Sequence, residues 1–502
     1  MRPYIPRRHV IARNFGLFTR QIGNQAIATE KISIVSSSKT SKELVIKNLE
    51  RHLADRPKKY VHTSISGHGA AIFASQDFAS WLRDETFMSN VLRALFKSNI
   101  AGESNSQDVN VLCAVTDGLA PKRLLGQPEP GFSILYGSSN DILPGLWDQD
   151  EFGSNVDEDR ESSVSFQSTP LPGDTRPLEI TFPLANTVFQ NGRRSTLFAS
   201  KWQASHDMSM VHTSIQEKRT QRIRAHATSA GHTYPFLPLL PLTPPRKIVA
   251  GLGNIVRQVE VNGSTAPASK ELEGLIPKIF DARSQRNPDF SPGPIGVWCL
   301  VIPSHVVERY NLGDIKVFKP ESSGSEAELS VETMNMFSEL MSSGCRLHKI
   351  LSGGGGWGLK QGLLSLDPET NYSLPGQDDV EMFIKAFHER NSPDSSEGLV
   401  TPGSYLMFCI EPHCTEKEIR ESQQMNPTTV VGVTSDNDQV LNYSGPTDHI
   451  EIIDDHFGIV SKAGVFLKAT SLPHMVDVSN RNTKQTQAFT TKVDFPRASF
   501  VL

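Results

Sequence analysis

Four consecutive glycines at 353–356 constrain the fold of this chain most, because few backbone arrangements can use them. A glycine inside a helix or strand costs roughly 0.5–1 kcal/mol relative to alanine, so the run needs a compensating interaction. CRLHKIL (345–351) before the run alternates polar and apolar residues, and GLLSLD (362–367) after it is a second short apolar segment. The pattern predicts two strands joined by a glycine-rich loop, with another group lying against the main chain of the loop.

Two kinds of neighbour fit such a loop. Consecutive backbone N–H groups can hold an anion, and a main chain without side chains also lets a protein segment or another small ligand approach. A P-loop needs lysine directly after its last glycine, whereas Leu359 separates Gly358 from Lys360. The sequence leaves the neighbour open. The candidate ligand-binding residues are Gly353, Gly354, Gly355, Gly356, Trp357, Gly358, Lys360 and His348.

The chain carries no motif that assigns catalysis. Alternation along 345–351 places either His348 or Lys349 inward, where His348 could carry a proton if the loop is a site, although such a histidine is more often structural. The patterns G-x-S-x-G and H-E-x-x-H are both absent. CIEPHC (409–414) places a histidine between two cysteines without a second pair, so we expect Cys409 to be a buried strand residue and predict no metal site. Enzyme status and cofactors stay open.

The composition of the first 29 residues is that of a targeting segment. They contain five arginines and no acidic residue, and the first acid is Glu30. On a helical wheel Arg13 and Arg20 lie opposite an apolar face. That face consists of Ile11, Phe15, Phe18 and Ile22. This pattern is typical of a mitochondrial transit peptide. The alternative is a disordered basic tail. We expect a cleavable presequence at 1–29 and a location in the mitochondrial matrix.

The chain of 502 residues is too long for one core, because single cores stop growing near about 250–300 residues. Hydrophobic residues at 37%, charged residues at 21% and a formal net charge of −5 indicate a soluble globular protein without a general nucleic-acid-binding charge. The richest apolar stretch, PFLPLLPLTPP (235–245), is interrupted by prolines, so we predict no membrane span.

The first half is predicted to be an N-terminal α/β domain at 30–205. Thr40 and Glu43 have capping-box spacing at the start of its first helix. An acidic, serine-rich stretch at about 148–175 is expected to be a flexible insertion. The predicted elements are helices at 40–53 and 75–97 and strands at 109–118, 131–137 and 178–184.

NTVFQNGRRSTLFASKW (186–202) centres on Asn191-Gly192, a strong signal for a tight hairpin. Arg193 and Arg194 would then project near its tip. Asn191, Arg193 and Arg194 are therefore candidates for contact with an anionic ligand, although exposed arginines after a turn are more often only solvated.

Residues 206–245 are predicted to be a basic, proline-rich linker. A basic helix leading into an extended proline segment favours a linker or a partner-docking arm, with contact to RNA phosphates as the second interpretation. The candidate RNA-binding residues are Lys218, Arg219, Arg222 and Arg224.

Residues 246–502 are predicted to form a C-terminal α/β domain that contains the glycine-rich loop. The fold class is therefore α/β, or α+β, with two domains of mixed sheets flanked by helices after the presequence. The predicted elements are two strands within 246–263, helices at 268–282, 330–344 and 379–390, and strands at 295–303, 405–410, 428–433, 449–454 and 458–469.

Several motifs resemble those of a group of mitochondrial proteins of filamentous fungi. The shared motifs are LSGGGGWG (351–358), GLLSLDP (362–368), PGLW (144–147) and PLANTVFQNG (183–192). This resemblance implies a mitochondrial location and assigns no catalytic residue. More remotely, VNVLCAVTDG (109–118) followed by GFSILYGSSNDILPG (131–145) is similar to FIST-type sensory domains, which implies binding of a small ligand.

These observations favour a soluble ligand-binding or interaction protein of the mitochondrial matrix, with a small-molecule, anionic or protein partner. The first alternative is a mitochondrial gene-expression factor that contacts RNA or the ribosome through 217–224. The second is a nucleotide-dependent enzyme built around the loop at 353–358.

Overall fold

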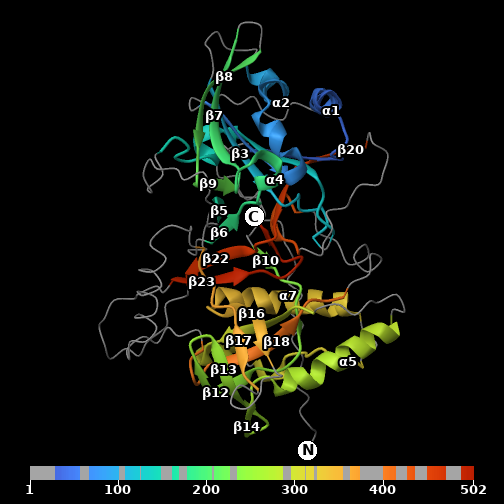
Figure 1. Ribbon diagram of the computed structural model, residues 1–502, viewed down its shortest axis with the longest axis vertical. Helices are drawn as coiled ribbons and strands as arrows, with labels where there is room; N and C mark the ends of the chain where they lie inside the picture. The colour runs from blue at the N-terminus through green and yellow to red at the C-terminus, as the bar shows by residue number, and fades with distance from the viewer. Residues whose placement is uncertain are drawn as a thin grey trace, which may run out of the picture.

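The fold is mixed α/β, as the sequence predicts, with helices packed on several sheets (Figure 1). No helix of the described part of the chain is long and apolar enough to cross a membrane. The computed structural model describes residues 29–56, 67–100, 108–124, 126–148, 161–168, 178–205, 209–225, 234–286, 295–310, 312–321, 325–353, 362–372, 400–413, 427–435, 449–470 and 488–502.

A seven-stranded sheet organises the first half of the chain. β2 and β3 run parallel, and the other neighbours are antiparallel. Helices α1 (Lys42–Asp55) and α2 (Glu85–Ile100) cover one face. The strand order is β20 (Ile450–Asp454), β1 (Glu30–Ser36), β4 (Gly131–Ser138), β2 (His68–Ser75), β3 (Asp108–Thr116), β7 (Leu197–Ala204) and β8 (Met210–Glu217).

The helix starts follow from side-chain capping. The Ser41 hydroxyl accepts the Leu44 N–H, so α1 begins one residue later than the predicted Thr40 cap. Asp84 accepts the Phe87 N–H and thereby divides the predicted helix at 75–97 into η1 (Gln76–Arg83) and α2. The other short helical turns are α3 (Ser139–Ile142), α4 (Val188–Asn191) and η2 (Leu312–Asp314).

A second, five-stranded sheet packs against the other face of the seven-stranded sheet. Phe73 of β2 meets Phe166 of the five-stranded sheet at a ring-centroid distance of 6.5 Å, and it meets Phe457 of the four-stranded sheet described below at 5.4 Å. Fully buried aromatic rings from both sheets therefore share one core. The strand order is β23 (Ala488–Val493), β22 (Val465–Thr470), β6 (Glu179–Pro183), β5 (Ser163–Ser168) and β9 (Thr220–Ala225).

A four-stranded sheet extends this core. Its central strand β19 runs parallel to β21 and antiparallel to β24. The strand order is β10 (Tyr234–Phe236), β24 (Ser499–Val501), β19 (Thr429–Val433) and β21 (Phe457–Ser461).

The middle of the chain forms a closed antiparallel barrel. The ring closes because β18 pairs with both β12 and β15. The ring consists of β12 (Arg246–Leu252), β13 (Ile255–Val261), β17 (Leu364–Leu366), β16 (Arg346–Gly353), β15 (Val297–Ile302) and β18 (Tyr405–Ile410). The accompanying elements are β11 (Leu240–Pro241), β14 (Ser264–Pro267), α5 (Lys270–Arg286), α6 (Ser304–Tyr310) and α7 (Glu326–Ser342).

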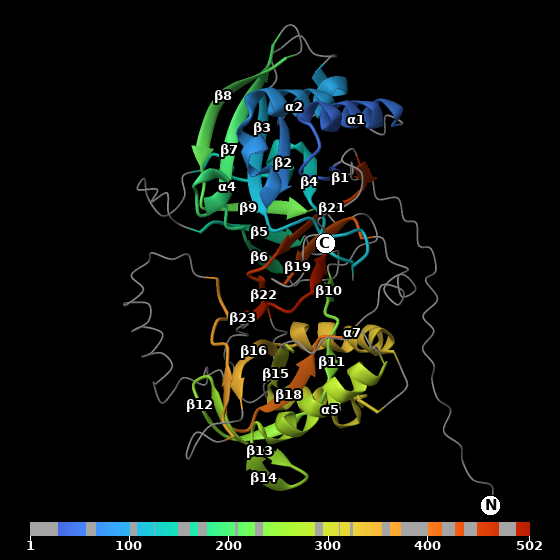
Figure 2. The ribbon, with the colours of Figure 1, turned by 45° about the vertical axis from the view of Figure 1, so that its right-hand side comes forward.

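The sheets do not follow the division into 30–205 and 246–502. β20 adds to β1 and β22 adds to β6, so the end of the chain completes the sheets of the first half. Figure 2 shows the red C-terminal strands lying beside the green and blue strands, above the barrel. The strand pairing therefore does not follow the predicted boundary at 245/246: the barrel strands come from residues 240–410, between β10 and β19.

The predicted linker at 206–245 is also corrected. Residues 210–217 form β8 of the seven-stranded sheet, and residues 220–225 form β9 of the five-stranded sheet. The expected basic helix is therefore a strand. The predicted insertion at about 148–175 and the predicted helix at 379–390 lie largely or wholly outside the described residues.

Candidate functional site

The predicted hairpin at 186–202 is instead a compact turn that we call the Phe189 turn, residues 186–196. Val188–Asn191 form the single helical turn α4, and Gly192 ends it with φ 77 while its N–H donates to the Val188 carbonyl at 2.9 Å. A glycine with positive φ can either end a helix or form a two-residue hairpin turn. Here the Asn-Gly pair ends a helix.

Side-chain hydrogen bonds fix the shape of the Phe189 turn. The buried Thr187 hydroxyl donates to the Arg193 carbonyl at 2.9 Å and lies 2.9 Å from the Thr196 hydroxyl. Asn191 donates to the Thr196 hydroxyl at 2.8 Å and accepts the Arg193 N–H at 3.1 Å. The turn is therefore held from within.

This fixed turn carries apolar side chains into solvent. Phe189 is 97% exposed and Val188 is 41% exposed. Beside them Arg193 forms an ion pair with Glu217 at 2.8 Å, and Arg194 is exposed. A phenylalanine that loses almost no exposed area on folding gains almost nothing from the hydrophobic effect, so its place here is not explained by stability.

The strands flanking the glycine run are confirmed. β16 and β17 pair antiparallel, with Gly353 opposite Leu364. A Cβ at Gly353 would lie 2.5 Å from the Leu364 side chain, so close packing explains the first glycine. The other predicted loop residues lie outside the described residues, so their proposed contact stays a prediction. They are Gly354, Gly355, Gly356, Trp357, Gly358 and Lys360.

His348 is the inward residue of the alternating strand, and Lys349 is exposed. His348 Nδ1 lies 2.9 Å from the Asp367 carbonyl, and Nε2 is buried with no hydrogen-bond partner among the described residues. Burial lowers the pKa of His348 below its usual value, which favours the neutral imidazole. β16 lies in the barrel, so the structure does not bring His348 together with the Phe189 turn (Figure 1).

The basic segment does not form one surface. Lys218 and Arg219 are buried, and the Lys218 ammonium donates to the carbonyls of Leu146 at 2.8 Å and Asp148 at 3.3 Å. Arg222 and Arg224 alternate outward along β9 and are exposed. Two of the four proposed RNA-binding residues are therefore buried in the interior, and two lie on the surface.

We expect Lys218→Met to lower the free energy of unfolding by about 2 kcal/mol, because two carbonyls lose a charged donor. The double change Arg222→Gln with Arg224→Gln should stay within about 0.5 kcal/mol of wild type, because both side chains are exposed. Urea unfolding measures both. Equal stability of Lys218→Met and wild type would contradict the structural role of this lysine.

A buried polar cluster joins β1 and β4 to β21, and the sequence did not predict it. Ser33 Oγ lies 2.9 Å from both Ser133 Oγ and His456 Nδ1. Ser133 donates to the Gly458 carbonyl at 2.7 Å and accepts the Gly458 N–H at 3.1 Å. The only sequence signal was a serine in each of two apolar strands, EKISIVS and GFSILYG.

This cluster is structural, although it contains serines beside a histidine. Ser33, Ser133 and His456 are each at most 1% exposed, and both hydroxyls lie at hydrogen-bond distance from main-chain carbonyls. Burial lowers the pKa of His456 to about 4 and that of the neighbouring Lys31 to about 8. A substrate has no access to these hydroxyls, so the cluster fastens the sheets together.

Four described cysteines, Cys113, Cys299, Cys345 and Cys409, are buried and unbonded, and burial raises the pKa of each thiol. Cys409 is the buried strand residue that the sequence predicts. Within the described ranges, no group of three or more His, Cys, Asp or Glu residues is arranged to hold a metal ion.

Comparisons with known protein families, curated proteins and solved structures found no match. Among the predicted sites, the Phe189 turn is the most sharply defined surface feature of the described residues.

Proposed function

We propose that the chain is a protein-interaction factor of the mitochondrial matrix and that the Phe189 turn is its docking surface. The main observation that supports this proposal is that Phe189 is 97% exposed on a turn fixed by its own hydrogen bonds. Binding energy in protein interfaces concentrates in a few aromatic and arginine side chains that enter pockets of the partner. A turn that is already ordered loses little conformational entropy when it binds.

The charge around the turn indicates the chemistry of the partner. Arg193 and Arg83 both contact the single acid Glu217, and the exposed Arg194 adds a further positive charge. The partner should therefore offer an apolar pocket for Phe189 with acidic side chains at its rim. The Arg-rich, acid-free segment 1–29 supports the matrix address.

The test places a photo-crosslinking phenylalanine analogue at position 189 of the precursor and imports it into isolated mitochondria. We expect one discrete crosslinked protein in the protease-protected matrix fraction. Its affinity for the purified chain should fall about 30-fold with Phe189→Ala, as removal of an interface anchor does, while the melting temperature stays unchanged.

Leu252→Ala is the matched control, because Leu252 is 80% exposed on the barrel, away from the turn. It should bind like wild type. Wild-type affinity of Phe189→Ala for the crosslinked protein would refute the docking surface, and a precursor that stays accessible to external protease would refute the address.

A further inference from the structure

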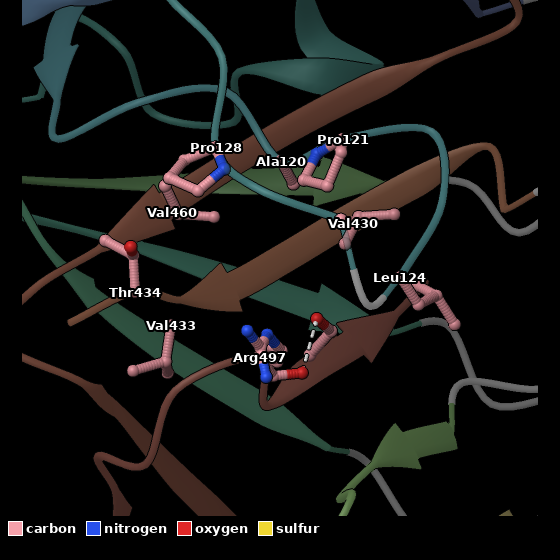
Figure 3. Close-up of a pocket in the computed structure, with 11 residues that line it drawn as sticks. Ala120, Pro121, Leu124, Pro128, Val430, Val433, Thr434, Val460 and Arg497 are labelled. Carbon is pink, nitrogen blue, oxygen red and sulfur yellow. Dashed lines mark hydrogen bonds between the residues drawn. The ribbon is translucent and has the colours of Figure 1, made fainter. Parts of the chain in front are cut away.

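A pocket beside β19, β21 and β24 has room for little more than a water molecule (Figure 3). Pro121, Pro128 and Val460 are among the residues that line it. An organic ligand does not fit there. Reactive chemistry is found instead in the two Asn-Gly pairs of the chain, Asn191-Gly192 and Asn262-Gly263.

An asparagine that precedes glycine can lose its side-chain amide without an enzyme. The main-chain nitrogen of the glycine loses its proton and attacks the side-chain carbonyl carbon, the bond from that carbon to the amide nitrogen breaks, and ammonia leaves. Water then opens the resulting succinimide ring at either carbonyl, which leaves aspartate or isoaspartate. Glycine favours the attack because no Cβ lies beside its nitrogen.

Asn262-Gly263 is the two-residue turn between β13 and β14. Both residues are exposed and have positive φ, 52 and 77, and Val261 pairs with Ser264 across the turn. Within the described part of the chain, neither the Asn262 amide nor the Gly263 N–H has a hydrogen-bond partner. Nothing lies within 4 Å of the position that a Cβ on Gly263 would take. The attacking nitrogen and the attacked amide are therefore both available.

The same pair in the Phe189 turn is held at both reacting groups. The Gly192 N–H donates to the Val188 carbonyl at 2.9 Å. The Asn191 amide donates to Thr196 Oγ1 at 2.8 Å and accepts the Arg193 N–H at 3.1 Å. These three hydrogen bonds must open before the reaction can begin, so they protect this turn.

We propose that Asn262 is a site of spontaneous deamidation, independent of the docking surface at the Phe189 turn. β14 lies at the end of the barrel that is far from the seven-stranded sheet (Figure 2). Among the described strands β14 pairs with β13 alone, whereas β13 also pairs with β12 and β17 in the ring. Isoaspartate adds a carbon atom to the main chain, so it should release the turn and β14 while the ring stays closed.

The test is incubation of the folded, intact chain at neutral pH, with peptide mapping by mass spectrometry over time. Asn262 should convert to aspartate and isoaspartate at least about tenfold faster than Asn191, because hydrogen bonds hold only Asn191. In the urea-unfolded chain the two rates should become similar, because each asparagine precedes a glycine. Conversion of Asn262 no faster than that of Asn191 in the folded chain, or the same difference in urea, would overturn the proposal.

Variants separate the effects of charge and main chain. Asn262→Gly keeps the positive φ without an amide, so it should melt like wild type and resist ageing at the turn. Asn262→Asp carries the charge of the product on a normal main chain. Limited proteolysis should cut the turn of the aged wild-type chain several-fold faster than that of Asn262→Asp, at an unchanged melting temperature. Equal cleavage of the two would overturn the isoaspartate assignment, and a lower melting temperature of the aged chain would overturn the confinement of the change to β14.

Discussion

Gly131→Ala should abolish folding of the chain. Gly131 begins β4 with φ 142, a conformation that is almost exclusive to glycine, and an added Cβ would lie 1.9 Å from the main-chain oxygen of Ile34. That oxygen belongs to the neighbouring strand β1 and cannot move aside alone. Strain and overpacking together cost about 4 kcal/mol or more, which is a large share of the stability of an ordinary protein.

Expression followed by thermal unfolding measures this effect. Gly253→Ala is the matched control, because Gly253 also has a positive φ, 61, but nothing lies within 4 Å of an added Cβ. It should cost only about 1 kcal/mol. A soluble Gly131→Ala chain with a wild-type transition would show that β4 does not lie against β1 as described.

The isolated fragment 30–245 should not fold. It lacks β20, β22 and the strands of the four-stranded sheet that follow the barrel, so β1 and β6 each lose a neighbour. It also loses Phe457, whose ring packs on Phe73 and Phe166. We expect no cooperative thermal transition by circular dichroism, and recovery of a folded complex when 30–245 and 246–502 are expressed together.

The division predicted from the sequence gives the opposite expectation, so the fragment decides between them. A cooperative transition for 30–245 alone, with the same midpoint as in the full chain, would mean that this fragment is an independent domain whose stability does not depend on the C-terminal strands.

Local signals in the sequence predicted much of the secondary structure. The helix at Lys42–Asp55 and the strands at Asp108–Thr116 and Gly131–Ser138 were predicted from apolar periodicity, although the cap of the helix is Ser41 and not the predicted Thr40. The pairing of these strands could not be predicted from such local signals. β20 joins β1 across more than half the chain, and no local pattern specifies a neighbour at that separation.

The basic segment carries two local patterns that predict different structures. TQRIRA (220–225) alternates outward arginines with inward Gln221, Ile223 and Ala225, which is a strand period, yet its charge favoured a helical linker. The Phe189 turn was located correctly and given the wrong turn type. Its most exposed residue, Phe189, was not among the predicted site residues, because hydrophobicity in a sequence normally indicates burial.

Insertion of the barrel between β10 and β19 sets an order of events during synthesis. Residues 240–410 can close their own ring as soon as they emerge, since every strand partner within the ring lies in that stretch. The strands between residues 30 and 225 emerge earlier, but their sheets are complete only after β20 and β22 have been made. Until then they expose apolar surface, so a chaperone that holds unfinished chains should be found on them.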